Sequence, residues 1–306
     1  MSAPHPQGAV AHAQPWLTHR RAVLLMVLVT FLWSTAGVVT RHLEHARSFE
    51  VTFWRSFFTV LSLLVLLPLT RGRDVFWRLR HAGWPLWAAG VCWSAMFTFF
   101  MVAMMLTTVA NVLITLALAP LLTALAAWLF LGHAVPRRTW WTIAAAGVGI
   151  ATMYAQQFSL GAGMAGMLVA LCVPVAGAAN WTLNHYAQTH GRRIDLIPAV
   201  WVGAVISSGV TLPLAWPFAA SAWDLQLLAG LGLFQLAIPC VLVVVCTRVL
   251  PSPEVALLGL LEVIFGIALA WLGADEVPRG AVLVGGALVI GALVVNEWMG
   301  WRQRQW

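Results

Sequence analysis

The sequence predicts an all-α integral membrane protein with about ten transmembrane helices, arranged as two inverted five-helix repeats. Three observations predict this fold class: apolar segments of membrane-spanning length, an asymmetric placement of arginines, and motifs shared by the two halves. Of the 306 residues, 61% are hydrophobic and 9% are charged, whereas a soluble domain carries about 25% charged residues. So few charges cannot cover a water-facing surface, so the lipid bilayer is the first expected partner.

Apolar segments of about 18–24 residues recur along the chain, separated by short polar breaks. A chain inside the bilayer must satisfy its backbone hydrogen bonds internally, and these segments lack the alternation of barrel strands, so we expect helices. Residues 1–18 are expected to form a disordered cytoplasmic N-terminus, and residues 299–306 a cytoplasmic tail. The expected spans are 22–40, 51–69, 84–105, 109–132, 139–156, 164–187, 196–217, 225–247, 253–273 and 280–298.

The 17 basic residues are all arginines, and they predict the orientation of the chain. If the N-terminus is cytoplasmic, the outer loops hold only Arg41, Arg47 and Arg279. This bias follows the positive-inside rule and places both termini in the cytoplasm. It also explains the formal net charge of +7 without a nucleic-acid partner. The inner loops hold Arg20, Arg21, Arg71, Arg73, Arg78, Arg80, Arg137, Arg138, Arg192, Arg193, Arg248, Arg302 and Arg304.

Short motifs recur in the same order in the two halves. Val135-Pro136-Arg137 precedes the fifth span, as Val277-Pro278-Arg279 precedes the tenth, and in this register Ala145 and Gly149 align with Ala287 and Gly291. Because five spans is an odd number, the second half (164–298) enters the membrane from the side opposite to the first (22–156). Secondary transporters have this architecture, with a substrate site near the midplane between the halves.

Several motifs resemble those of the drug/metabolite transporter superfamily, and within it the EamA type. The first span carries Leu32-Trp33-Ser34, like the family's Trp-Gly/Ser signature, and the second carries Phe53-Trp54-Arg55, like its aromatic-x-Arg. The proline that often follows the glutamate of the ninth span in the family is replaced here by Val263. The resemblance implies ten helices in two inverted repeats, and export or facilitated movement of small organic metabolites across a bacterial inner membrane.

Two ionisable residues, Arg55 and Glu262, lie inside the expected spans. A charge at mid-helix costs about 2.5–3.5 kcal/mol, so such residues usually face the bundle interior or a wet cavity. Arg55 is a candidate contact for a substrate carboxylate, or else a structural arginine paired with Glu50 or Glu44. Glu262 is a candidate for proton coupling or for a substrate ammonium, or else a protonated structural group. Together they could hold a zwitterion such as an amino acid at both ends.

Other polar and aromatic side chains complete the expected substrate cavity. The alternative for each amide is hydrogen bonding between helices, and for each tryptophan packing against core or lipid. His185 is a second candidate for coupling, with a solvated histidine as the alternative. Pro120 and Pro239 interrupt apolar runs and are candidate hinges. The further cavity candidates are Trp33, Ser34, Trp93, Asn111, Thr115, Trp181, Asn184 and Gln235.

These features favour a secondary transporter that moves a small organic metabolite, such as an amino acid or a related carboxylate or zwitterion, by alternating access. A drug or organic-cation efflux carrier of the same fold is the alternative, and a membrane-embedded enzyme or a channel is a more distant one. Neither H-E-x-x-H nor G-x-S-x-G occurs, and the chain is not expected to be an enzyme. Its four cysteines lie in spans without metal-ligand spacing, so no cofactor or metal is expected. Pairs of small residues leave a homodimer open.

Overall fold

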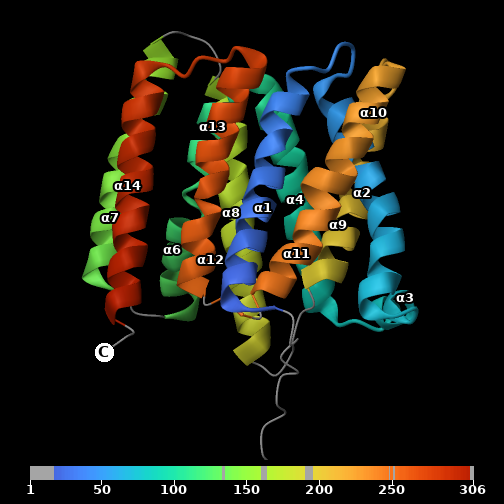
Figure 1. Ribbon diagram of the computed structural model, residues 1–306, viewed down its shortest axis with the longest axis horizontal. Coiled ribbons are helices and arrows are strands. Elements are labelled where there is room, and N and C mark those ends of the chain that lie inside the picture. The colour runs from blue at the N-terminus through green and yellow to red at the C-terminus, as the bar shows by residue number, and fades with distance from the viewer. Residues whose placement is uncertain are drawn as a thin grey trace, which may run out of the picture.

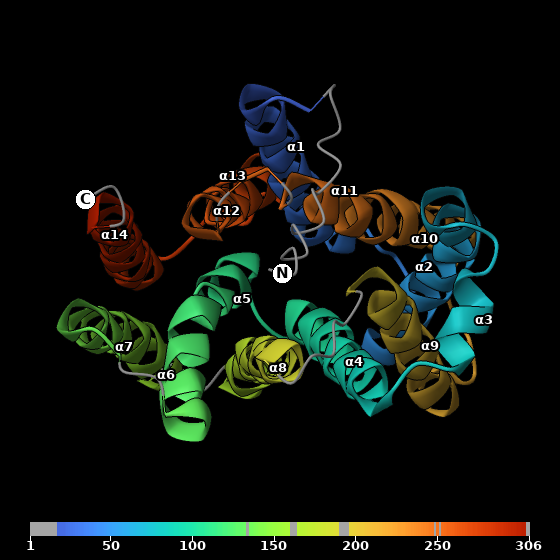
Figure 2. The same ribbon diagram turned by 90° about the horizontal axis from the view of Figure 1, so that it is seen from below.

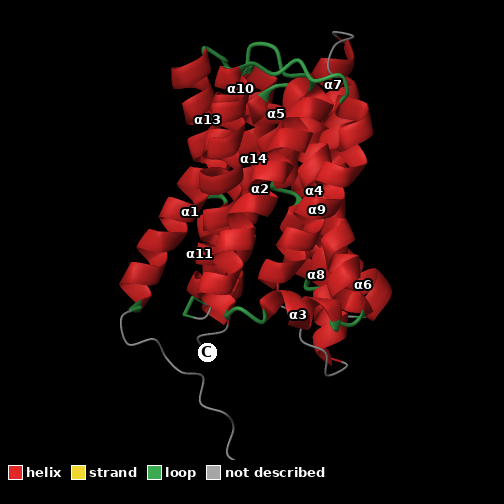
Figure 3. Ribbon diagram, turned by 90° about the vertical axis from the view of Figure 1, so that its right-hand side faces the viewer, coloured by secondary structure: helices red, strands yellow, loops and turns green. Residues whose placement is uncertain are grey.

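The computed structural model describes residues 17–132, 135–159, 164–189, 196–247, 249–250 and 252–303, and every regular element within these ranges is helical (Figures 1 and 3). The elements are α1 (His19–Thr40), α2 (Ser48–Arg71), α3 (Val75–Arg80), α4 (Trp84–Leu106), α5 (Val109–Leu116), α6 (Ala119–Leu131), α7 (Arg137–Ser159), α8 (Met164–Thr189), α9 (Leu196–Ala215), α10 (Ala222–Gly230), the π-helical turn η1 (Leu231–Ala237), α11 (Ile238–Cys246), α12 (Ser252–Gly259), α13 (Leu261–Ala274) and α14 (Gly280–Gln303).

The helices confirm the predicted class of an all-α integral membrane protein. In the described part of the chain, 8 helical segments are long and apolar enough to cross a membrane. The two remaining expected spans, 139–156 and 253–273, coincide with α7 and with α12 followed by α13. The expected tail is partly helical, because α14 continues to Gln303. Most of the expected disordered N-terminus lies outside the described residues.

The helices run side by side along the bundle, and α1 begins at the same end at which α14 terminates (Figure 1). Seen from below, the bundle is elongated, with α7 beside α14 at one end and α2 beside α9 at the other (Figure 2). The described arginines that are expected in inner loops lie near one end of the bundle. This is the end at which α1 begins and α14 terminates. We call this the arginine-rich end and the opposite one the arginine-poor end.

The two halves share interruptions and packing partners. The fourth span breaks between α5 and α6, and the ninth breaks between α12 and α13. The second helix of each broken span ends at a residue in the left-handed backbone conformation. These residues are Gly132 after α6, with φ 67°, and Asp275 after α13, with φ 52°. Helix α1 packs on α13 as α8 packs on α6, and α2 packs on η1 as α9 packs on α4. Such an exchange of partners is what an inverted repeat produces.

Both candidate hinge prolines lie at helix interruptions. Pro120 is in the first turn of α6, directly after the break in the fourth span. Pro239 is in the first turn of α11, directly after η1. Proline has no backbone N–H, and the first turn of a helix is where that missing donor is tolerated. Their locations fit the expected interruptions, and movement about them stays a prediction.

Close packing of α7 on α14 depends on glycine. A Cβ atom built on Gly149 would lie 2.7 Å from the backbone oxygen of Gly285. Real Cβ atoms essentially never approach so closely, so only glycine lets the two backbones lie this near. Gly291, the repeat partner of Gly149, faces open space instead. Of the aligned small residues, Gly149 therefore lies at the contact between α7 and α14. Its partner across this contact is Gly285, which was not among the aligned pairs.

A buried carboxylate ties the two halves together at the arginine-poor end. Asp224 in the first turn of α10 accepts hydrogen bonds from the backbone N–H groups of Glu44, His45 and Ala46 at 2.8–3.1 Å. It also accepts one from the N–H of Ser221 at 3.1 Å, completing a capping box at the start of α10. Because residues 44–46 link α1 to α2, this one side chain joins the first half to the second.

An ion pair joins the halves at a second place on the same end. The Arg41 Nε atom donates to Glu276 at 2.7 Å, and its Nη atoms donate to the backbone oxygens of Met104 and Thr107. The other oxygen of Glu276 accepts from the N–H of Val109 at 2.6 Å, at the first residue of α5. A carboxylate suits this position because the N-terminus of a helix is electropositive. The loop between α13 and α14 is thereby held against α1, α4 and α5.

Candidate functional site

Arg55 lies at the centre of the candidate site, fully enclosed by the bundle. Arg55 is 1% exposed, and its side chain is among the largest fully buried ones in the described chain. Its Nη1 atom donates to Gln235 Oε1 at 3.1 Å, and its Nη2 atom donates to the backbone oxygen of Phe97 at 3.3 Å. Its Nε atom is buried without a hydrogen-bond partner in the described structure. Both partners of this guanidinium are neutral.

The structure rules out the pairings proposed as the structural alternative for Arg55. The carboxylate of Glu50 accepts from the backbone N–H groups of Ala219 and Ala220 at 2.8–3.1 Å. Glu44 is exposed, and its carboxylate lies 3.8 Å from His45. Among the described ion pairs none includes Arg55. The buried guanidinium thus has no carboxylate partner within the described part of the chain.

Gln235 reaches Arg55 because η1 lies close to α2. A Cβ on Gly232 would lie 2.7 Å from Phe58 Cβ and 2.9 Å from the backbone nitrogen of Thr59, so only glycine fits at this crossing. The hydroxyl of Thr59 donates to the backbone oxygen of Arg55 at 2.8 Å and approaches that of Gly232 at 3.4 Å. One turn further along, Gln235 Nε2 donates to the Trp33 backbone oxygen at 3.4 Å. The amide therefore connects Arg55 on α2 to α1.

Aromatic rings cover the other side of Arg55. Its guanidinium carbon lies 5.6 Å from the ring centroids of both Phe97 and Phe100 on α4, within cation–π range. The Trp93 ring packs against Phe97 with 5.5 Å between centroids, and its indole nitrogen is buried without a described partner. The structure thus gathers Arg55, Trp93 and Gln235 from the sequence-predicted set, whereas Trp33 contributes its backbone oxygen and its side chain packs against another apolar cluster.

Glu262 lies on a different helix, and no described contact joins it to Arg55. It is part-buried in the first turn of α13, just after the break at Leu260, and none of the described hydrogen bonds or ion pairs involves its carboxylate. One turn later, a Cβ on Gly266 would collide with Leu113 and lie 3.6 Å from Ser34 Cβ. Helix α1 therefore connects the two regions, since Trp33 contacts Gln235 and the adjacent Ser34 packs against α13.

Asn111 and Thr115 form a separate buried pair on α5. The Asn111 amide nitrogen donates to Thr107 Oγ1 at 3.0 Å, and the Thr115 hydroxyl donates to the Asn111 backbone oxygen at 2.7 Å. Asn111 Oδ1 is buried without a described partner. Buried polar atoms nearly always have a partner, so this oxygen is an acceptor that a ligand or water could satisfy.

The remaining candidates make no described hydrogen bond or ring contact with Arg55, and some of them are exposed. Ser34 is buried and donates to the Phe31 backbone oxygen at 2.6 Å. Asn184 is buried on α8. Trp181 is 48% exposed and His185 is exposed, so neither belongs to the packed core. A role for these two in substrate binding or coupling stays a prediction.

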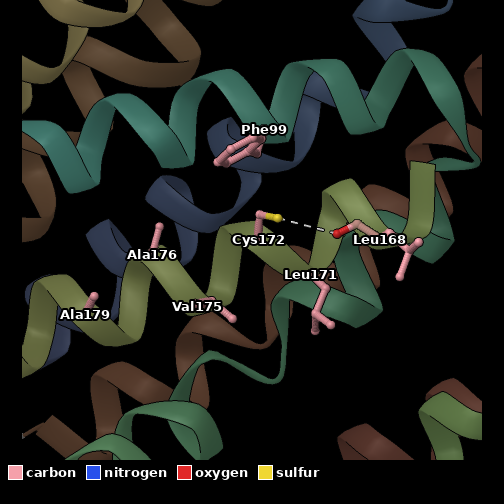
Figure 4. Close-up of a pocket in the computed structure, with 7 residues that line it drawn as sticks. All are labelled: Phe99, Leu168, Leu171, Cys172, Val175, Ala176 and Ala179. Carbon is pink, nitrogen blue, oxygen red and sulfur yellow. Dashed lines mark hydrogen bonds between the residues drawn. The ribbon is translucent and has the colours of Figure 1, made fainter. Parts of the chain in front are cut away.

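The apolar pocket in Figure 4 is distinct from this site. It has a volume of about 360 Å³, and Cys172 donates within it to the Leu168 backbone oxygen at 3.6 Å. Leu168 and Val175 are among the exposed hydrophobic residues, so the pocket opens at the surface. It is lined by Phe99, Leu168, Leu171, Cys172, Val175, Ala176 and Ala179. None of the candidate residues lines it, and it suits a lipid chain better than a polar metabolite.

Sequence reasoning missed the contributions of Phe97, Phe100 and η1. A backbone oxygen and two phenyl rings leave no distinguishing mark in an apolar run. For η1 a signal was present, because Pro239 lies four residues after Gln235 and cannot donate the usual helical hydrogen bond to its carbonyl. π-Helical turns are rare in proteins. Those that do occur are frequently found at functional sites.

Comparison with known proteins identifies relatives over almost the whole chain. Residues 20–155 match the EamA-like transporter family. The pseudopaline exporter CntI from two strains of Pseudomonas aeruginosa, UCBPP-PA14 and PAO1, is 25% identical over 287 residues, covering 90% of this chain and 95% of the relative. A solved crystal structure of a protein covers 94% of this chain and 99% of its own, with a TM-score of 0.61 and 19% identity. That last likeness shows the fold alone.

The apolar helical bundle is that of a multi-pass membrane protein, and the proteins it resembles are transporters. Residues 20–155 are similar to the EamA-like transporter family, which agrees with the resemblance noted from the sequence motifs. The matched range 20–155 coincides with the first expected repeat, residues 22–156.

Proposed function

We propose that the protein exports a small organic metabolite bearing a carboxylate, such as an amino acid or a related zwitterion, across the bacterial inner membrane by alternating access. Arg55 binds the carboxylate. Glu262 binds the ammonium group or takes part in coupling. The relatives named as exporters support export as the direction.

The observation that carries this proposal is the pairing of buried Arg55 with neutral groups only. Burying a guanidinium without a counter-ion is costly, and charged residues within membrane spans usually serve function. Gln235 and the Phe97 carbonyl offset part of that cost but leave the positive charge uncompensated. Arginine, with its planar guanidinium, is the residue best suited to bind a carboxylate in a low-dielectric interior, and Arg55 has N–H groups left unused.

Counterflow in proteoliposomes tests the substrate class and the role of Arg55. The probes are matched pairs of an amino acid and its decarboxylated amine: L-histidine with histamine, L-tyrosine with tyramine, and L-serine with ethanolamine. We expect saturable exchange of at least one amino acid and not of its amine. Arg55→Gln should lower that exchange by about 10- to 100-fold, because a hydrogen bond to a charged group contributes about 1.5–3 kcal/mol.

Arg279→Gln is the matched control, since Arg279 is exposed between α13 and α14. It should exchange the amino acid at the wild-type rate. Exchange of the amines at equal rates, unaffected by Arg55→Gln, would instead support an organic-cation carrier. Flux that does not saturate would support a channel.

Full-length fusions test the proposed orientation. With both termini cytoplasmic, as the arginine bias predicts, a C-terminal green fluorescent protein should fluoresce in a bacterial host. A C-terminal alkaline phosphatase should be inactive, because that enzyme folds only outside the cytoplasm. The opposite pair of results would place the arginine-rich end outside and reject the proposed topology.

A further inference from the structure

Gln235 occupies the place on Arg55 that a carboxylate would take. Its Oε1 atom lies 3.1 Å from Arg55 Nη1, within the range of an N–H···O hydrogen bond, and takes up a donor that a carboxylate oxygen could use. The neighbouring Nε atom points to no described partner. Arg55 has five N–H donors, and the described hydrogen bonds use two of its three nitrogens. A carboxylate oxygen could engage Nη1 if the amide moved away, and the unused Nε lies on the edge of the guanidinium that it shares with Nη2.

The backbone around Gln235 is unusual in a way that bears on this exchange. The π-helical turn η1 uses wider hydrogen bonding, and the N–H of Ile238 donates to the Leu233 oxygen, five residues back. Pro239 cannot donate to the Gln235 carbonyl in the α-helical manner. The residue that holds Arg55 is thus carried by a segment without continuous α-helical hydrogen bonding.

We propose that Gln235 is a neutral placeholder for the substrate carboxylate: it holds Arg55 in position without cancelling its charge, and a carboxylate oxygen displaces it on binding. This inference rests on the proposed function. Displacement is favoured because a carboxylate adds a charge–charge attraction to Arg55 that a neutral amide lacks, and this attraction is strong in a low-dielectric interior. Displacement also breaks the bond from Gln235 Nε2 to the Trp33 oxygen, and so loosens η1 from α1.

The placeholder makes opposite predictions for two variants. In Gln235→Glu a permanent carboxylate occupies Arg55, so the KM for the exchanged amino acid should rise at least about tenfold. In Gln235→Leu, which is close in volume and cannot accept a hydrogen bond, the competitor is gone. Its KM should be equal to or below that of the wild type, even where the maximal rate falls. A purely structural amide would instead raise the KM in both variants.

The measurement is the KM and maximal rate of counterflow for L-histidine, L-tyrosine and L-serine, with size-exclusion profiles to verify folding. Gln235→Glu with a wild-type KM, or Gln235→Leu with a KM raised as much as in Gln235→Glu, overturns the placeholder role. If Gln235→Glu does not fold, the KM of Gln235→Leu decides alone. Wild-type-like exchange by Arg55→Gln would show that the proposed carboxylate site itself is wrong, and the placeholder with it. A normal loss in Arg55→Gln confines a failure to Gln235.

Discussion

Replacing Asp224 by Ala is expected to destabilise the protein by at least about 3 kcal/mol. The Asp224 carboxylate is buried and accepts hydrogen bonds from four backbone N–H groups, three of them in the link between α1 and α2. Hydrogen bonds to charged groups contribute about 1.5–3 kcal/mol each, and the freed N–H groups would lose their acceptor. The loss should appear as a lower midpoint of heat-induced aggregation, measured by size-exclusion chromatography in detergent.

Asp74→Ala is the matched control for this prediction. Asp74 is exposed and pairs with Arg78 one turn away at 2.8 Å. Exposed pairs of this kind contribute about 0.3–0.5 kcal/mol, so its midpoint should scarcely change. Equal midpoints for the two variants would mean that Asp224 does not hold the halves together.

Replacing Gly149 by Leu is expected to cost about 3 kcal/mol of stability, because the new Cβ would meet the Gly285 backbone at 2.7 Å. Only separation of α7 from α14 could relieve that contact. The effect should be visible in the same aggregation assay and as a loss of counterflow.

Gly147 provides the control. It lies two residues before Gly149 on the same helix, and a Cβ there meets nothing within 4 Å. Leucine favours the helix over glycine by somewhat less than about 1 kcal/mol, so Gly147→Leu should be neutral or slightly stabilising. The opposite signs of the two variants distinguish backbone contact from helix propensity. Destabilisation by both would assign the effect to exposure of leucine rather than to helix crossing.

The location of the spans was predictable from hydropathy, whereas their interruptions were not. A bilayer demands long apolar segments whatever their neighbours, so hydropathy alone located the helices. The break between Leu116 and Ala119 lies among apolar residues on both sides, as does η1. Hydropathy does not vary across such breaks, and only Pro120 and Pro239 indicated them.

The candidate site was predictable where a polar group stands alone in an apolar run. Arg55 and Gln235 were identified in this way, and the structure brings them into contact. Which helix faces which neighbour depends on crossings such as Gly232 on α2, and a single sequence does not encode these locally. For that reason the rings of Phe97 and Phe100, which lie 5.6 Å from the Arg55 guanidinium carbon, were missed.

The π-helical turn also changes the phase of the span that contains it. One extra residue in a helix rotates everything beyond it by about 100° around the axis. Helix α10, before the turn, packs on α2, whereas α11, after it, packs on α1. A single span can thus present its faces to two neighbours that an uninterrupted helix would not contact in the same way. The length of the segment 231–237 is consequently as constrained as its composition, and deleting one residue there would turn α11 away from α1.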